Sequence, residues 1–326
     1  MKSSTQRRIW KMQGAEKEVH LKEMEKVFEF YPAVKGSGFQ MEGYHIWCGS
    51  VLKEGDTYYL FAARWKKEKS FPLGYLTDSE IVLAKTEDLN KPFQFVKTII
   101  GKRDGGYWDS MMAHNPYIIK IGDEYVLYYI GSPDGGTVTR KIGFAHTKDI
   151  LGEWQRADKA IELPPDANNP CAVATPNNEI LLYFRDGSLK VSVAKATRYD
   201  GEYTVLNDNI FPESGMEDMF VYPTDKGYEM LLEDGSGYYT GLPYGGAWFS
   251  SSDGIVWDRK NVRMAYDFNV TYDDGTKIVM QRRERPFLLF DGDRTYLFNA
   301  AKINGETQRT GGDTWNFVQE IKAKNE

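Results

Sequence analysis

Apolar and polar positions along the chain form a repeating unit that contains two short apolar runs. Its clearest copy is Tyr107–Ile130, where a polar pair before a proline (His114, Asn115) is followed by an apolar run, a Gly-Asp turn and a second run that ends in tyrosines. β-branched and aromatic residues favour strands, and Gly-Asp between two such runs is typical of a tight hairpin. The unit therefore predicts two antiparallel strands, the first of which follows the polar pair.

The same unit occurs five times. The pairs that open it are Trp47-Cys48, His114-Asn115, Asn168-Asn169, Glu217-Asp218 and Glu284-Arg285. They recur every 49 to 67 residues, whereas the second run always begins 11 or 12 residues after the start of its pair. A fixed hairpin joined by variable outer loops, repeated at this period, is typical of propeller blades.

Two further strands complete each unit. The third strands are expected at residues 79–85, 141–147, 190–196 and 247–252, the outer strands at 93–95, 154–155, 203–205 and 257–258, and the fifth unit ends with 315–318. Five units of four strands predict an all-β fold, a five-bladed β-propeller. One or two β-sandwiches of similar strand count are the alternative, but a sandwich would not require one template to recur five times.

Bulk composition narrows the class of protein. The chain has 326 residues, 41% of them hydrophobic and 14% aromatic, which is ample for a core. A formal net charge of −6 argues against a nucleic-acid partner, because phosphate binding needs a concentrated basic face. No apolar run is long enough for a membrane span. The two cysteines, Cys48 and Cys171, open different blades, so we expect buried thiols and no disulfide.

The N-terminal segment differs from the repeats. It is basic at first but lacks the apolar core of a secretion signal, so we expect either a cytoplasmic protein or an exported one whose leader had been removed. Residues 15–28 have helix-forming composition. We therefore expect residues 1–40 to form an arm with a short helix, and residues 41–322 to form a single five-bladed catalytic domain.

The five polar pairs are expected to meet. The first strand of each blade lines the central channel of a propeller, so the pairs should form a ring around one funnel. A hydrogen-bonded ring that merely closes the funnel is one interpretation, especially for Asn115 and Asn169, because an unpaired buried polar group costs roughly 1–3 kcal/mol. Glu217, Asp218 and Glu284 favour a catalytic interpretation, because carboxylates brought together shift each other's proton affinity.

Residues 40–320 resemble a known group of enzymes. The phrases GDTYYLFAARW, HNPYIIKIGDEYVLYY and ERPFLLFDGDRTYLF are similar to those of the five-bladed propeller glycosidases, glycoside hydrolase family 43 and its relatives. The resemblance implies cleavage of a glycosidic bond in an oligo- or polysaccharide. It also implies a carboxylate base before blade one, a modulating Asp before blade three and a Glu acid before blade four. Glu217 stands at the acid position, but Trp47-Cys48 and Asn168-Asn169 replace the two aspartates, so the sequence resembles a divergent member.

Asp109 and Glu284 are the candidates for the missing base. Asp109 lies five residues ahead of the blade-two pair, on a loop expected to reach over the funnel, and a turn Asp that bonds its own backbone is the alternative. Glu284 is followed by Arg285 and preceded by two more arginines, which favour its ionised form either as a base or as their partner.

The resulting hypothesis is hydrolysis by two carboxyl groups. Glu217, kept protonated by Asp218 and partial burial, would protonate the leaving oxygen, and Asp109 or Glu284 would activate water from the opposite side. The residues expected to bind the carbohydrate are Trp47, Arg64, Trp65, Trp108, His114, Asn115, Asn169 and Arg285. No second histidine lies at ligand spacing from His114, so no catalytic metal is expected and no cofactor is required. A structural cation in the central channel is left open.

Three other functions fit the same fold. A glycoside phosphorylase would hold phosphate with a cationic cluster drawn from Arg64, Arg185, Arg282, Arg283 and Arg285. A non-catalytic glycan-binding propeller is favoured by the missing blade-one aspartate. A protein-interaction scaffold would need no open site at all.

Overall fold

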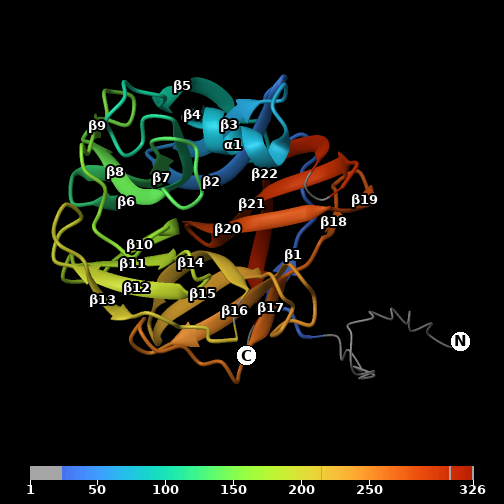
Figure 1. The fold of residues 1–326 in the computed structure, drawn as a ribbon. Helices are drawn as coiled ribbons and strands as arrows, with labels where there is room; N and C mark the ends of the chain where they lie inside the picture. Colours follow the sequence, from blue (N-terminus) through green and yellow to red (C-terminus); the bar gives the residue numbers. More distant parts are fainter. Residues whose placement is uncertain (1–23, 214, 308–309, 325–326) are drawn as a thin grey trace, which may run out of the picture.

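The computed structural model describes residues 24–213, 215–307 and 310–324. Five four-stranded antiparallel sheets surround one axis, as Figure 1 shows. Their innermost strands are β2 (Tyr44–Glu54), β6 (Met112–Ile121), β10 (Asn168–Ala174), β14 (Met216–Thr224) and β20 (Arg282–Asp291). The prediction of a five-bladed β-propeller is confirmed, and each innermost strand is the one expected from its polar pair.

The outer strands follow in chain order away from the axis. They are β3 (Thr57–Lys66), β4 (Glu80–Thr86) and β5 (Gln94–Ile100) in blade one; β7 (Glu124–Ser132), β8 (Lys141–Thr147) and β9 (Gln155–Arg156) in blade two; β11 (Ile180–Arg185), β12 (Val191–Ala196) and β13 (Thr204–Asn207) in blade three; and β15 (Gly227–Asp234), β16 (Gly245–Ser251) and β17 (Arg263–Tyr266) in blade four. The prediction for the outer strand of blade four was wrong. Residues 257–258 lie in the loop before β17, where Trp257 is buried and its ring packs edge-on against Tyr183.

Blade five is closed by the beginning of the chain. It consists of β20, β21 (Arg294–Gly305), β22 (Gly311–Ala323) and β1 (Phe28–Phe30), with Phe28 paired to Ala323. The N-terminal arm expected at residues 1–40 falls largely on residues 1–23, which lie outside the described residues. Phe28, the last residue of the expected helix, is the first residue of β1, so the propeller includes a strand from the segment expected to form the arm.

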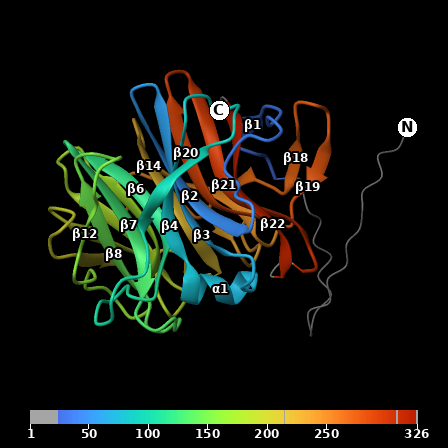
Figure 2. The ribbon, with the colours of Figure 1, turned by 90° about the horizontal axis from the view of Figure 1, so that it is seen from above.

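Two insertions between strands were not predicted. Helix α1 (Phe71–Asp78) joins β3 to β4, and a small hairpin of β18 (Asn269–Thr271) and β19 (Lys277–Val279) joins β17 to β20. Figure 2 shows α1 at one end of the propeller. It has eight residues, and no helix in the described part of the chain is long and apolar enough to cross a membrane.

One backbone device recurs at all five polar pairs. The pairing register between the first and second strands shifts there in every blade, as in a β-bulge. The second residue of each pair has a positive φ: Cys48 (51°), Asn115 (52°), Asn169 (53°), Asp218 (63°) and Arg285 (54°). Bulges bend a strand and re-aim a side chain, and non-glycine residues rarely adopt this conformation. In every blade, therefore, the bulge changes the direction in which the side chains of the polar pair point.

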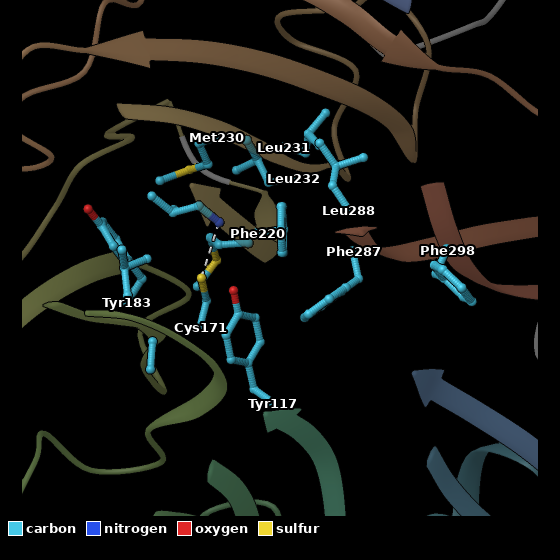
Figure 3. Packing of buried hydrophobic residues seen from close by; sticks show 14 of the residues in the cluster. Tyr117, Cys171, Tyr183, Phe220, Met230, Leu231, Leu232, Phe287, Leu288 and Phe298 are labelled. Atoms are coloured by element: carbon cyan, nitrogen blue, oxygen red, sulfur yellow. Dashed lines mark hydrogen bonds between the residues drawn. The ribbon is translucent and has the colours of Figure 1, made fainter. Parts of the chain in front are cut away.

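An apolar layer fills the propeller just beyond the bulges. The rings of Tyr117, Phe220 and Phe287, three residues after the start of their pairs, pack at centroid distances of 4.7 to 6.3 Å, and Figure 3 shows them converging from three strands. Cys171 lies in the same layer, where its sulfur accepts the Val221 N–H. Both cysteines are buried and free, as their positions in different blades predicted.

Candidate active site

The floor of the funnel is a run of hydrogen bonds through the second residue of each pair. The Cys48 thiol donates to Asn115 Oδ1 at 2.9 Å, and Asn115 Nδ2 donates to Asn169 Oδ1 at 2.6 Å. Asp218 Oδ1 accepts from Asn169 Nδ2 and from Arg285 Nη1, each at 2.7 Å. These side chains are buried and bond to one another. The second residues of the five pairs therefore meet, as expected, in a hydrogen-bonded run from Cys48 to Arg285, whereas binding of substrate by Asn115, Asn169 and Arg285 stays a prediction.

The first residues of the last two pairs supply two further carboxyl groups. Arg185 of β11 binds Glu217, and Arg282 of β20 binds Glu284. The Glu217 side chain keeps 30% of its accessible surface, whereas the Glu284 side chain keeps 6%. Glu217 is therefore the more open of the two to a ligand in the funnel.

Burial and like charge raise the pKa of both groups. For Glu217, burial raises the pKa most and the Asp218 carboxylate adds to it, against the pull of Arg185. For Glu284, burial raises the pKa to about 7 although Arg282 opposes the shift. The charge of Glu217 contributes to the rise in the pKa of Glu284, so the two carboxyls lie close enough to interact.

Sequence reasoning missed a fourth carboxyl group in this cluster. Glu233 lies on β15 directly across from Glu217, and oxygens of Asp218, Glu233 and Glu284 all lie within 4.8 Å of one another. Glu233 is 1% exposed. The available signal is a charged residue in the otherwise apolar run MLLED, but it belongs to a second strand, whereas the repeat places its polar pairs before the first strands.

Other polar groups near the carboxyl cluster lie in segments that the sequence did not single out. Tyr75 of α1 packs 4.9 Å from the His114 ring, and Asp166 and Glu217 lie near enough to add to the rise in its pKa that burial causes. Arg140 binds Asp166 through two hydrogen bonds of 2.8 and 2.9 Å. These groups lie in segments without periodic pattern, so only the fold brings them to the site.

Asp109 is not the loop residue over the funnel that we expected. It is completely buried, Arg103 Nε donates to it at 2.7 Å, and the Tyr129 hydroxyl donates to it at 2.6 Å. Arg156 binds the same carboxylate from β9. Trp108, expected to stack on a sugar, is buried against Tyr129 with its ring centroid 5.0 Å away. Both side chains therefore pack within the outer part of blade two. Asp109 was a candidate base because we expected it on a loop over the funnel, and the structure does not place it there.

This arrangement predicts a structural role for Asp109. Asp109→Asn should destabilise the protein by about 3–5 kcal/mol, because it leaves buried arginines without their counter-ion. Urea unfolding measures the loss, and Asp123→Asn is the matched control, since the Asp123–Lys148 pair is exposed to solvent and contributes little to stability. Equal small losses in the two variants would contradict the assignment.

The blade-one residues are also more enclosed than expected. Trp47 and Trp65 are buried under Phe71 of α1, with ring centroids 4.9 and 5.4 Å from that phenyl ring. His114 Nδ1 lies 2.8 Å from Ser79 Oγ, and burial lowers the pKa of His114 well below its usual range. This side of the site is therefore an aromatic wall that α1 covers, and carbohydrate binding by Trp47, Trp65 and His114 stays a prediction.

Arg64 points away from the cluster. Its Nε donates to Glu80 Oε1 at 2.8 Å, and its guanidinium lies over the rings of Tyr44 and Phe95 at 4.5 and 4.6 Å. Thr98 of β5 accepts another of its hydrogen bonds. These partners hold Arg64 on the outer strands of blade one, which argues against the role in substrate binding that we expected.

Comparison with known proteins identifies a structural class. The chain matches no protein-family model, and no curated protein sequence matches it. It is similar to a solved glycoside hydrolase, with a TM-score of 0.68, 15% identity and 93% of each chain covered. It is also similar to a thermostable family-43 glycoside hydrolase, with a TM-score of 0.62, 12% identity, and 91% of this chain and 96% of the other covered. A family 117 glycoside hydrolase from the marine bacterium Zobellia galactanivorans gives a TM-score of 0.63 at 12% identity, over 92% of this chain and 90% of the other.

These similarities concern the fold. The architecture is that of the five-bladed propellers found in glycoside hydrolases of families 43 and 117, and the resemblance of the sequence pattern to that group is borne out by the structure. Identities of 12–15% leave residue roles to be argued from this chain's own site.

Proposed function

We propose that the protein is a glycoside hydrolase in which Glu217 is the general acid and Glu284 is the general base. The observation that supports this most is the convergence of these two carboxyls from adjacent blades at one funnel, with the pKa of each raised. Paired carboxyls of this kind are what most glycosidases use. The reaction requires no cofactor.

The two environments suit the two roles. Glu217 is the more exposed carboxyl, and burial together with the neighbouring Asp218 favours its protonated form, as a proton donor to a leaving oxygen requires. Glu284 is more enclosed, and Arg282 bonds to it and favours the ionised form that a base needs. Its pKa of about 7 lets it accept a proton near neutral pH.

The chain's other site residues act by positioning. Asp218 is fixed by Asn169 and Arg285, so its carboxyl group is held beside Glu217. The Arg140–Asp166 pair and Tyr75 lie near the carboxyl cluster, where they can meet the hydroxyl groups of a carbohydrate. Whether a water or Glu284 itself attacks depends on the carboxyl separation, about 6.5–9.5 Å for inversion and about 5–5.5 Å for retention.

Product release from defined substrates tests this proposal. The protein is incubated with nitrophenyl glycosides of common pentoses and hexoses and with a panel of plant and algal polysaccharides, with and without inorganic phosphate. We expect reducing sugar to be released independently of phosphate. Binding without any product, detected by calorimetry on the same panel, would replace the enzyme with a glycan-binding propeller.

Phosphorolysis is a second candidate because arginines lie at both carboxyls. Arg185 and Arg282 contact Glu217 and Glu284, so an anion in the funnel would meet cations there. Of the other arginines expected in this cluster, Arg285 bonds to Asp218 in the floor at 2.7 Å. Arg283 is buried and bonds to Asn299 at 2.9 Å, and Arg64 lies on the outer strands. Formation of a sugar phosphate, dependent on added phosphate, would favour this function over hydrolysis.

A further inference from the structure

Three of the four clustered carboxylates have an arginine of their own, and Glu233 has none among the described residues. Arg185 binds Glu217, Arg282 binds Glu284 and Arg285 binds Asp218. Among the described residues, neither carboxyl oxygen of Glu233 has a hydrogen-bond partner. With 1% of its surface exposed, Glu233 cannot use bulk water to compensate.

The groups that face Glu233 make its ionised form unfavourable. One of its oxygens lies within 4.8 Å of an oxygen of Asp218 from β14 and of an oxygen of Glu284 from β20, and Glu217 is its cross-strand partner on the same face. Arg282 is the cation that acts on Glu233, but its guanidinium bonds to Glu284. An ionised Glu233 would therefore be a buried charge beside like charges without a donor.

The outer strands of the blade add another unpartnered group. Gly246 of β16 lies opposite Glu233, and the ring of Tyr266 on β17 occupies the space that a side chain at Gly246 would need. The Tyr266 hydroxyl is buried without a hydrogen-bond partner in the described structure, and the charged groups that act on it include Glu233, Arg283 and Asp218. A row of Glu233, Gly246 and Tyr266 thus crosses blade four and keeps Glu233 enclosed.

We propose that Glu233 holds a proton at neutral pH and donates it in a hydrogen bond to the Asp218 or Glu284 carboxylate, which makes it a positioning residue for Glu284. A protonated carboxyl is both donor and acceptor, so Glu233 can donate a further hydrogen bond to a neighbouring carboxylate. Because it is then neutral, it no longer repels Asp218 and Glu284. The role in positioning rests on the proposed function, whereas the protonation itself does not.

The sign of the stability effect follows from linkage. If the pKa of Glu233 is raised in the folded protein but is about 4.3 in the unfolded chain, then at any pH between the unfolded and the folded pKa the folded state binds one more proton than the unfolded chain. The unfolding equilibrium constant of the wild type should then rise with pH by up to about tenfold per pH unit relative to Glu233→Gln, whose amide cannot ionise. The gain of Glu233→Gln over the wild type should be absent at about pH 4 and should grow toward about pH 8.

Urea unfolding of the two proteins at about half-unit pH steps measures this difference without a substrate. The control is Glu229→Gln, because Glu229 lies on the same strand but accepts a hydrogen bond from Trp248 Nε1 at 2.9 Å. Parallel curves for wild type and Glu233→Gln would overturn the proposal. An equal gain with pH in the Glu229→Gln control would also overturn the proposal, because it would not be specific to the carboxyl cluster. So would a melting temperature that calcium or magnesium raises and chelation lowers in the wild type only, because that result would mean an ionised Glu233 that binds a cation.

A second measurement covers a variant that does not fold. Infrared spectra of the double variant Glu217→Gln, Glu284→Gln, which removes the two other clustered carboxyls whose pKa is raised, are recorded as the pH is raised from about 5 to about 9 and should retain the band of a protonated carboxyl at about pH 7. Loss of every such band below that pH would contradict the proposal. In the active enzyme, Glu233→Gln should keep kcat within about threefold of wild type and Glu233→Leu should lose about tenfold or more, because only the amide retains a donor.

Discussion

Glu217→Ala should lower kcat on glycosides with poor leaving groups by about 10²–10⁴-fold, the usual contribution of a positioned general acid. Dinitrophenyl glycosides need little protonation of the leaving oxygen, so their hydrolysis should be affected much less. The measurement is kcat for a series of aryl glycosides of increasing leaving-group ability, in wild type and variant. A steep dependence on the leaving group in the variant alone identifies the lost proton donor.

The control for this experiment is Glu213→Ala. Glu213 accepts hydrogen bonds from Tyr239 and Arg259, and no hydrogen bond or ion pair joins it to the carboxyl cluster in the described structure. It should leave the leaving-group dependence unchanged. Equal loss on good and poor leaving groups in Glu217→Ala would assign Glu217 to binding or to structure.

Glu284→Ala should show the opposite pattern. A base or nucleophile is needed whatever the leaving group, so kcat should fall by about 10²–10⁴-fold on poor and activated substrates alike. Small anions such as azide or formate should restore part of the rate on activated substrates, because they fit the space that the carboxylate leaves. No rescue, together with a loss confined to poor leaving groups, would exchange the roles of Glu217 and Glu284.

The pH profile gives an independent check on Glu284. A base must be ionised, so activity should fall as the pH drops through the Glu284 pKa of about 7, and this acid limb should disappear from the residual activity of Glu284→Ala. An acid limb that is unchanged in the variant would show that another group sets it.

The architecture could be read from the sequence because each blade repeats one local pattern. The apolar runs, the turn between them and the polar pair recur at positions fixed by hairpin geometry. This pattern can be recognised although the sequence is only 12–15% identical to the solved structures compared above. Strand β1 could not be found this way. It has three residues, and only its pairing with β22 at the far end of the chain makes it a strand.

The site was read only in part because burial cannot be seen in a local pattern. Glu217 and Glu284 follow from their place in the repeat, whereas Asp109 and Trp108 looked equally suitable in sequence. Their burial against Tyr129 depends on contacts with β7 and β9. Glu233 was missed for the same reason, since only the fold shows that it lacks a partner among the described carboxylates and their arginines.

The central claim is that one sugar ring lies between Glu217 and Glu284 in the funnel. Crystals of the protein soaked in arabinose, xylose, galactose or glucose test it most directly. We expect a bound monosaccharide over the Cys48–Arg285 floor, with its anomeric carbon between the two carboxyls. A sugar bound only elsewhere, or one that contacts neither Glu217 nor Glu284, would contradict the account.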